Sequence, residues 1–192
     1  MIQIVLASSS PFRKELLQRL HLKFETNSPD IDENAIKGES PSTLVERLAR
    51  SKALAVAENY PNAIIIGSDQ VAVCNNRVLG KPGNLENATE QLEFVSGKLV
   101  TYFTGLCVFN AANNELQYDH VKFYVEFRQL TEKMIANYLE KEPAFNCAGS
   151  FKSEALGIAL THSMSGKDPT SLIGLPLIRL IEMLEKAGIE II

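Results

Sequence analysis

The sequence predicts an α/β protein in which helices flank a sheet. Short apolar runs rich in β-branched residues, such as residues 63–66, are typical of buried strands, and they alternate with capped segments of helical periodicity. Two long β-rich runs, residues 99–110 and 115–129, flank a polar turn at residues 111–114 and predict a β-hairpin. A chain of 192 residues is long enough for one full core and short for two, so we expect a single domain over residues 1–192.

The composition is that of a soluble globular protein. Hydrophobic residues make up 45% of the chain and charged residues 22%, and no apolar run approaches the roughly 18 residues of a membrane span. Residues 2–7 are too short for a secretory signal and lack a basic flank, so we expect a cytoplasmic protein that does not bind a membrane. The net charge of -4 disfavours binding to nucleic acid, and an anionic ligand would need a local cluster of cations.

The cysteines and histidines show no pattern of a disulfide framework or a zinc site. Cys74, Cys107 and Cys147 are odd in number, widely spaced and without a CxxC pair, so we expect free thiols that are buried or half-buried. The three histidines lack HxH or HExxH spacing and are better explained as surface or packing residues than as ligands.

The N-terminal stretch combines features of an anion site. An apolar strand at residues 4–7 leads into three serines, and a helix follows from Pro11 to about residue 20, with Ser10 as its N-cap. Arg13 and Lys14 lie in the first turn, where cations are normally disfavoured, which suggests an anion between them. A phosphate cradle and an ordinary strand-to-helix junction both remain open at this point.

Further helices are predicted where a cap or turn precedes apolar side chains at helical spacing. They cover residues 41–58 after Ser40, 85–95 after Asn84, 132–141 after Thr131, and 177–186. In the first of them, Lys52 continues the apolar row of Leu44 and Leu48, because residues four apart share one stripe of a helix. Lys52 is therefore predicted to face inward, either at the edge of the core or aimed into a cleft.

The apolar run of residues 63–66 is predicted to be a buried strand that stops at Gly67 and restarts at Val71. Asp69 would then lie at the end of a core strand, where open α/β sheets gather their ligands. An acid at that place favours a functional role over a loop-capping aspartate. Short extended pieces and a turn complete the expected elements, at residues 24–28, 78–79 and 165–169.

Two loops have compositions that suit contact with a ligand. Residues 80–83, Gly-Lys-Pro-Gly, form a rigid loop that presents Lys81. Residues 146–157 are rich in small residues and carry Glu154, a composition that permits close approach of the backbone to a ligand. A solvated loop charge and a tight surface loop are the alternative interpretations.

The charged residues at these positions suit a triphosphate bound together with a metal. Cations neutralise non-bridging phosphate oxygens, while carboxylates hold a hard cation such as Mg²⁺. The sequence lacks the GxxxxGK[ST] motif of P-loop NTPases and the GxSxG elbow. The residues in question are the cations Arg13, Lys52 and Lys81 and the acids Asp32, Glu33 and Asp69.

A series of short motifs resembles the Maf family in order and spacing over nearly the whole chain. They are Leu6-Ala7-Ser8-Ser9-Ser10-Pro11-Phe12-Arg13, Asp32-Glu33, Lys52, Gly67-Ser68-Asp69-Gln70, Gly80-Lys81-Pro82, Ser96-Gly97-Lys98, Cys147-Ala148-Gly149-Ser150 with Glu154, and Asp168-Pro169 with Gly174-Leu175-Pro176. The resemblance implies a nucleoside triphosphate pyrophosphatase, commonly a homodimer. The implied fold is Maf/ITPase-like, a mixed twisted sheet with flanking helices and a deep nucleotide-binding cleft.

The resemblance also implies roles for single residues. Asp69 corresponds to the proposed general base, and Asp69 and Glu33 are the catalytic residues nearest a divalent metal cation, which would be Mg, Mn or Co. Whether Asp69 takes a proton or only ligates the metal is left open. The residues that match the phosphate-binding set are Ser8, Arg13, Lys52 and Lys81.

The resemblance also implies that three residues determine base selectivity, because they match positions that separate the branches of the family. They are Phe12, Gln70 and Glu154. The branch of the family that favours dTTP and UTP usually has Arg, Thr and Gln at these places. Here Glu154 would accept hydrogen bonds from the N1 and N2 donors of guanine, and 7-methylation makes the ring cationic, which favours stacking on Phe12. The pattern resembles the branch that acts on 7-methyl-GTP, although that branch often has Trp where Phe12 stands.

The resemblance therefore implies hydrolysis of 7-methyl-GTP to 7-methyl-GMP and pyrophosphate, which removes a modified nucleotide from the pool. One alternative is a pyrophosphatase acting on dTTP, UTP or other modified nucleotides. Another is a nucleotide-binding regulator of septum formation, in which catalysis is incidental.

Overall fold

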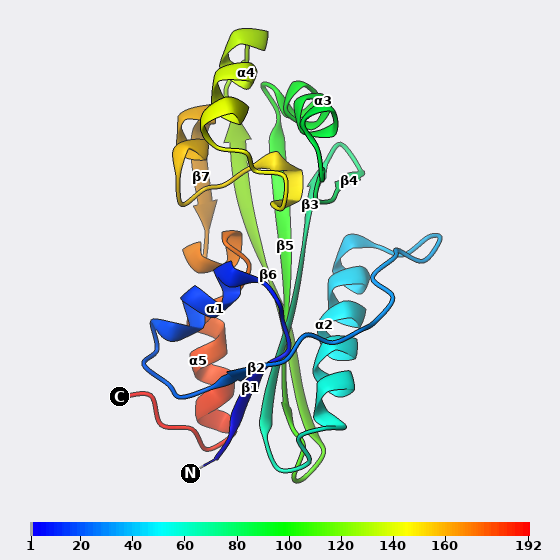
Figure 1. The fold of residues 1–192 in the computed structure, drawn as a ribbon, viewed down its shortest axis with the longest axis vertical. Helices are drawn as coiled ribbons and strands as arrows, with labels where there is room; N and C mark the ends of the chain where they lie inside the picture. The colour runs from blue at the N-terminus through cyan, green and yellow to red at the C-terminus, as the bar shows by residue number, and fades with distance from the viewer. Residues whose placement is uncertain (1) are drawn as a thin grey trace. The chain divides into compact units, whose positions relative to one another are not determined.

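The computed structural model describes residues 2–192, and helices alternate with strands along most of that range. In chain order the strands and helices are β1 (Ile4–Leu6), α1 (Pro11–Gln18), β2 (Glu25–Thr26), α2 (Pro41–Ala57), β3 (Ile64–Cys74), β4 (Arg77–Leu79), α3 (Leu85–Val95), β5 (Leu99–Asn110), β6 (Glu115–Phe127), α4 (Glu132–Lys141), β7 (Thr161–Gly166) and α5 (Leu177–Lys186) (Figure 1). Short 3-10 helices are η1 (Ala148–Ser150), η2 (Leu156–Leu160) and η3 (Pro169–Leu172).

The chain divides into two compact units. The first consists of the residues up to Asp69 together with Thr104–Val121 and Thr170–Ile192, and the second consists of Gln70–Phe103 and Lys122–Pro169. Strands β3, β5 and β6 contribute residues to both units. The single domain over residues 1–192 stays a prediction.

Across the described residues, the strands form a mixed sheet with the hydrogen-bonded order β2-β1-β3-β5-β6-β7, and β4 pairs with β3. Strand β1 runs parallel to β2 and β3, whereas β4 is antiparallel to β3 and β7 is antiparallel to β6. The predicted α/β fold with a mixed sheet and flanking helices is confirmed. The deep cleft stays a prediction.

The N-caps predicted from the sequence are confirmed. In each case the cap side chain accepts a hydrogen bond from the backbone N–H of the third helical residue, which satisfies a donor that the helix leaves unpaired. The caps are Ser10, Ser40, Asn84 and Thr131. Helix α1 ends at Gln18, earlier than expected, and His21 follows with a φ of 55°.

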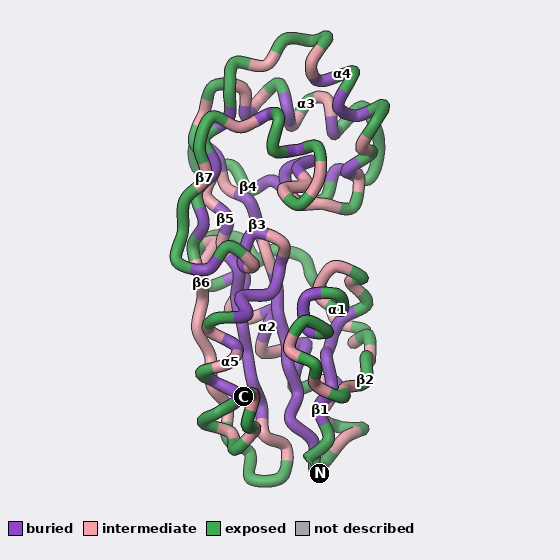
Figure 2. The backbone as a smooth tube through the Cα atoms, turned by 90° about the vertical axis from the view of Figure 1, so that its left-hand side faces the viewer, coloured by how far each residue is buried: buried purple, intermediate pink, exposed green. Residues whose placement is uncertain are grey.

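In the first unit, the strands carry apolar side chains on both faces. Successive residues of a strand point to opposite faces, so Ile4 and Leu6 of β1 join one core while Val5 and Ala7 join another. The buried strand residues are coloured purple in Figure 2. The helices that cover the two faces do so through Leu16 and Leu17 of α1, Leu180 and Leu184 of α5, and Ala49, Ala53 and Val56 of α2.

In the second unit, aromatic residues hold the segment after α4 against the strands. The ring of Phe151 lies 5.2 Å from that of Phe127 in an edge-on arrangement and 6.3 Å from that of Tyr102. Helix α3 contacts both α4 and η1. The loop that carries Glu154 therefore begins from a packed position.

The predicted interruption of the strand at Gly67 is wrong, because β3 continues through it to Cys74. The glycine serves close packing instead of ending the strand. A Cβ at this position would overlap the carbonyl oxygen of Ala49 and lie 3.0 Å from the backbone nitrogen of Ala53, both on α2. Asp69 accordingly lies within a continuous buried strand and not at its end.

Residues 165–169 were expected to form a turn, but Ser165 and Gly166 belong to strand β7. Most of β7 is polar and exposed, with no apolar alternation to reveal a strand in the sequence. Pairing with β6 forms the strand, and Gly166 opposes Phe123, whose ring would overlap a Cβ at the glycine. A tertiary contact therefore determines this element.

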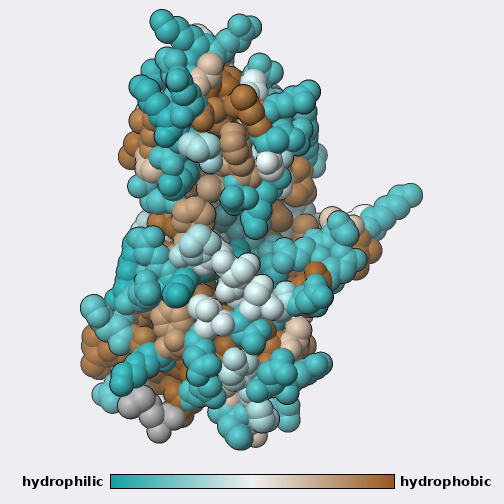
Figure 3. Space-filling view, in the orientation of Figure 1, coloured by the Kyte–Doolittle hydropathy of each residue, from teal (hydrophilic) through white to brown (hydrophobic). Residues whose placement is uncertain are grey.

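The thiols fit the expectation from the sequence. Cys74 and Cys107 are buried, Cys147 is half-buried, and all three are free, as predicted. None of the helices described for residues 2–192 combines the length and apolar character needed to span a membrane. Figure 3 shows hydrophilic side chains over much of the visible face.

Replacing Gly67 by alanine tests the close packing of α2 on β3. We expect G67A to lower the free energy of unfolding by about 2 kcal/mol, because the added methyl group forces the two backbones apart. Urea unfolding would measure the change. Gly80→Ala is the control, since a Cβ there meets nothing within 4 Å. Equal stability of G67A and G80A would contradict the packing role.

Candidate active site

The centre of the candidate site is an ion pair between Lys52 of α2 and Asp69 of β3. Lys52 Nζ lies 2.7 Å from Asp69 Oδ1, and the two residues are only 5% and 7% exposed. The inward orientation predicted for Lys52 is confirmed. The free energy needed to remove two charges from water often exceeds the attraction that the buried pair regains. A buried pair of this kind is therefore better explained by a role in a reaction than by a contribution to stability.

Glu33 is a second carboxylate on the same ammonium. Its Oε1 lies 3.0 Å from Lys52 Nζ, and its side chain is 55% exposed. One cation is thus shared between a buried acid on β3 and an exposed acid on the loop before α2. The two carboxylates lie close together and carry one more negative charge than the lysine balances.

Arg47 ties the loop that carries Glu33 to α2. Its guanidinium donates to the carbonyl oxygen of Asn34 at 2.9 Å and to Glu39 Oε1 at 2.7 Å. The hydrogen bond from Arg47 lowers the pKa of Glu39 to about 2, so that carboxylate stays charged. The ion-pair partners of Lys52 among the described residues are Glu33 and Asp69, whereas Asp32 Oδ1 accepts from the backbone and side chain of Asn34.

Arg13 is held in place by a backbone carbonyl. Its Nε donates to the oxygen of Gly174 at 2.8 Å, and the same oxygen accepts from Ser68 Oγ at 3.0 Å. Burial lowers the pKa of the guanidinium, while the charges of Asp69 and Glu33 act in the opposite direction. Arginine remains protonated in proteins, so Arg13 supplies a fixed positive charge in the field of both acids.

Ser8 and Ser10 shape the turn before α1. Ser8 Oγ accepts from the backbone N–H of Ser10 at 3.1 Å and lies 3.5 Å from a terminal nitrogen of Arg13. Ser10 caps the helix by accepting from the N–H of Arg13 at 3.4 Å. The first unit therefore gathers Ser8, Arg13, Lys52, Asp69 and Glu33, and Phe12 lies half-buried in the first turn of α1.

The other predicted site residues belong to the second unit. Lys81 is exposed in a loop held by two side chains of α3: Asn87 Nδ2 donates to Pro82 O at 2.9 Å and Gln91 Nε2 donates to Gly80 O at 3.2 Å. Gln70 follows Asp69 in β3 and is half-buried.

Glu154 is exposed at a bend built around Lys152. The carbonyl oxygen of Lys152 accepts from the N–H groups of Ala155 and Gly157. The Nζ of Lys152 lies 2.7 Å from Glu142 Oε1. Burial, with Glu154 as the next cause, raises the pKa of the Cys147 thiol to about 11. Cys147 is therefore protonated at neutral pH and unsuited to act as a nucleophile.

Some residues that build the site received no role from the sequence. Ser68 and Gly174 lie in the motifs that carry the family resemblance, which is the available signal for them. Nothing in the sequence around Arg47 indicates its contact with Asn34. All three act through hydrogen bonds accepted by backbone carbonyl oxygens, so their importance depends on distances that the sequence does not reveal.

The acids of the cluster fit a hard divalent cation. Among residues 2–192 there is no group of three or more histidine, cysteine, aspartate or glutamate side chains that could hold a metal by itself. Mg²⁺ typically takes one or two carboxylates and completes its coordination with water and substrate phosphates. Asp69 and Glu33, gathered on one ammonium, match that donor set.

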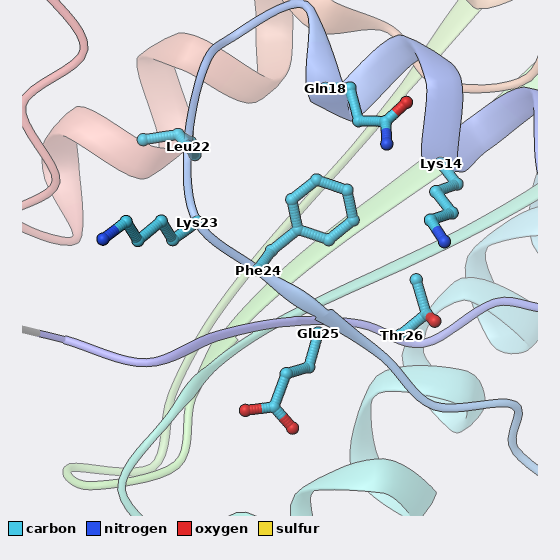
Figure 4. Close-up of a pocket in the computed structure, with 7 residues that line it drawn as sticks. All are labelled: Lys14, Gln18, Leu22, Lys23, Phe24, Glu25 and Thr26. Carbon is cyan, nitrogen blue, oxygen red and sulfur yellow. The ribbon is translucent and has the colours of Figure 1, made fainter.

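A surface hollow in the first unit is lined by residues of α1, of β2 and of the segment that leads into β2. Its volume is about 550 Å³, and Figure 4 shows Phe24 pointing toward α1 while Glu25 points away from it. Of the residues that line it, Lys14 is the one that the sequence placed, with Arg13, beside a suggested anion. The lining residues are Lys14, Gln18, Leu22, Lys23, Phe24, Glu25 and Thr26.

Comparison with known proteins places similarity along nearly the whole chain. A profile of the family described as "Maf-like protein" matches residues 3–187. The 7-methyl-GTP pyrophosphatase of Colwellia psychrerythraea is 53% identical over 189 residues, which cover 98% of this chain and 94% of that protein. The 7-methyl-GTP pyrophosphatase of Pseudomonas aeruginosa is 53% identical over 191 residues, covering 100% of both. Among solved structures, the Ham1 protein of Staphylococcus aureus matches with a TM-score of 0.47 and 16% identity over 66% of this chain and 72% of that chain.

Removing Lys52 alone should cost more than removing the ion pair. We expect K52M to lower the free energy of unfolding by about 3 kcal/mol, because Asp69 is left buried without a counter-charge. The double variant K52M/D69N should recover most of that loss. Urea unfolding compares them with Arg77→Met, which breaks an exposed pair and should cost less than about 1 kcal/mol. A K52M variant as stable as R77M would contradict the buried pair.

Proposed function

The chain belongs to the Maf family, and we propose that it is a nucleoside triphosphate pyrophosphatase that hydrolyses 7-methyl-GTP to 7-methyl-GMP and pyrophosphate. The observation that carries the proposal is 53% identity, over nearly the full length, to relatives named 7-methyl-GTP pyrophosphatase. The cluster of Lys52, Asp69 and Glu33 supports it, because cations and carboxylates gathered at one place suit a metal-bound triphosphate.

Arg13 and Lys52 bind the phosphates in this mechanism. The Nε of Arg13 donates to Gly174, which fixes the plane of the guanidinium, and its terminal nitrogens, one of them 3.5 Å from Ser8 Oγ, would meet phosphate oxygens. Lys52 adds a compact positive charge, and Ser8 adds a hydroxyl from the turn before α1. Lys81 enters the phosphate-binding set from the family resemblance.

Asp69 acts as the general base. Its carboxylate accepts a proton from water as the water oxygen forms a bond to the α-phosphorus. The bond between the α-phosphorus and the oxygen that bridges to the β-phosphorus breaks, and that oxygen leaves with pyrophosphate. Lys52 orients Asp69 through the 2.7 Å contact, so the carboxylate is held in place before substrate arrives.

Asp69 and Glu33 would hold the divalent cation, which we propose to be Mg, Mn or Co. When bound, the cation supplies neutralisation of the charge that builds on the triphosphate. Because Glu33 is exposed and Asp69 is buried, Glu33 is the acid that can move with the least disturbance of the fold.

Base recognition is proposed to use Phe12, Gln70 and Glu154. The carboxylate of Glu154 accepts from the N1 and N2 donors of guanine, and Phe12 stacks on a ring that 7-methylation has made cationic. The family resemblance further supports a cytoplasmic homodimer as the working form.

A nucleotide panel tests the substrate. We expect kcat/KM for 7-methyl-GTP to exceed the values for GTP and dTTP by about tenfold or more, because only the methylated base combines cationic stacking with the Glu154 contact. Glu154→Gln should lower the value for 7-methyl-GTP and leave that for dTTP near wild type. Glu140→Gln, an exposed acid of α4, is the control. A preference of the wild type for dTTP or UTP would overturn the assignment.

Replacing Asp69 tests the chemical step. We expect D69N to lower kcat by about 10²–10⁴-fold with a smaller effect on KM, because the amide accepts no proton at neutral pH. Adding Mg²⁺, Mn²⁺ or Co²⁺ to chelator-treated protein should restore turnover of the wild type but not of D69N. Asp119→Asn, at an ion pair with Arg179, is the control. Near-wild-type turnover of D69N would refute both the base and the metal role.

A further inference from the structure

We infer that Gln91 on α3 is a positioning residue that couples two loops of the second unit. The Lys81 loop consists of residues 80–83, and the Glu154 loop consists of residues 147–157. The inference rests on the proposed function, because that is where Lys81 is assigned to phosphate binding and Glu154 to base recognition. Gln91 would set the spacing between the groups that contact the two ends of the nucleotide.

The side-chain amide of Gln91 contacts both loops at once. Its Nε2 donates to the carbonyl oxygen of Gly80 at 3.2 Å, and its Oε1 accepts from Ser150 Oγ at 2.7 Å. The N–H of Gly149 also donates to Gly80 O, at 3.2 Å, so the loops touch directly beside the amide. Gln91 supplies a donor and an acceptor from one planar group, which neither an ionised carboxylate nor a hydrocarbon side chain can do.

The backbone around Ser150 requires support. Ser150 is fully buried with a φ of 58°, and the preceding Gly149 has a φ of 68°. A non-glycine residue in the left-handed region is disfavoured and persists where its surroundings fix it. The buried hydroxyl also needs a partner, and Gln91 supplies it.

Asn87 provides an internal comparison on the same helix. It lies four residues before Gln91, so both side chains share one stripe of α3. Asn87 Nδ2 donates to Pro82 O at 2.9 Å and thereby anchors the Lys81 loop alone. Gln91 differs from Asn87 in adding the contact to the Glu154 loop.

The Glu154 loop has a second anchor on α4, which fixes a different relationship. The N–H of Lys152 donates to Tyr138 OH at 3.1 Å, and Lys152 Nζ pairs with Glu142 at 2.7 Å. These contacts locate the bend that carries Glu154 with respect to α4. Gln91 instead fixes the position of the loop with respect to Lys81. The spacing between Lys81 and Glu154 is what would affect the binding of a nucleotide that contacts both residues.

The test compares Gln91→Met and Gln91→Glu with two controls on α3. Gln91→Met removes both hydrogen bonds, Gln91→Glu keeps an acceptor for Ser150 but cannot donate to Gly80, and Asn87→Asp loosens the Lys81 loop alone. Glu90→Gln changes an exposed residue paired with Arg77. The readouts are kcat and KM for 7-methyl-GTP and dTTP, and amide hydrogen exchange of residues 147–157.

We expect both Gln91 variants to lower the ratio of kcat/KM for 7-methyl-GTP over dTTP by about fivefold or more, mainly through KM for 7-methyl-GTP. Exchange in residues 147–151 should accelerate in Q91M. N87D should change both substrates by a common factor, and E90Q should change neither. A ratio within about twofold of wild type in both Gln91 variants, or an equal shift in N87D, would overturn the inference.

Failure of the proposed function would look different. Parallel measurement of E154Q shows whether Glu154 reads the base at all, and the wild-type ratio shows which nucleotide is preferred. If E154Q leaves the ratio unchanged, the proposed base recognition fails. The exchange rates then decide the coupling by themselves: faster exchange of residues 147–151 in Q91M than in N87D supports it, and equal exchange overturns it.

Discussion

The burial of Lys52 opposite Asp69 constrains most of the first unit. A lysine that is 5% exposed needs a counter-charge within reach, and that charge lies on β3, so α2 must pack close to this strand. Gly67 permits the approach, because any side chain there would overlap the Ala49 carbonyl. Well-packed apolar residues would stabilise the unit equally or better. The pair is therefore explained by its retention of the negative charge of Asp69 on β3.

The carbonyl oxygen of Gly174 extends this arrangement to the start of α1. It accepts from Arg13 and from Ser68, residues that are far from it and from each other along the chain. Arg13 is thereby fixed through its Nε, and the negative charges of Asp69 and Glu33 act on its guanidinium. A backbone contact thus holds Arg13, and the ion pair with Asp69 holds Lys52, which lowers the cost of ordering these two cations when an anion binds.

Local signals in the sequence were sufficient for the helices and for Lys52. The cap at Ser40 and the four-residue spacing that ends at Lys52 both depend on contacts within one helix, which is why they are confirmed. The break expected at Gly67 is wrong, because the glycine is required by the close packing of α2 on the strand and does not interrupt the strand itself. Strand β7 was missed for a related reason, since its pairing with β6 is what makes a polar segment extended. The grouping of Ser68 with Gly174 likewise depends on a distance across the fold.

The proposed base recognition by Glu154 depends more on loop geometry than on charge. An exposed carboxylate is well screened, so its attraction to a cationic base is worth little unless it is held where the donors of guanine arrive. The bend around Lys152 and the contact between Gln91 and Ser150 provide such support from α4 and α3. Neither contact involves the base. Discrimination between nucleotides would therefore depend on Gln91 and Lys152 as well as on Glu154. These two residues do not contact the base, but they fix the position from which Glu154 accepts its hydrogen bonds.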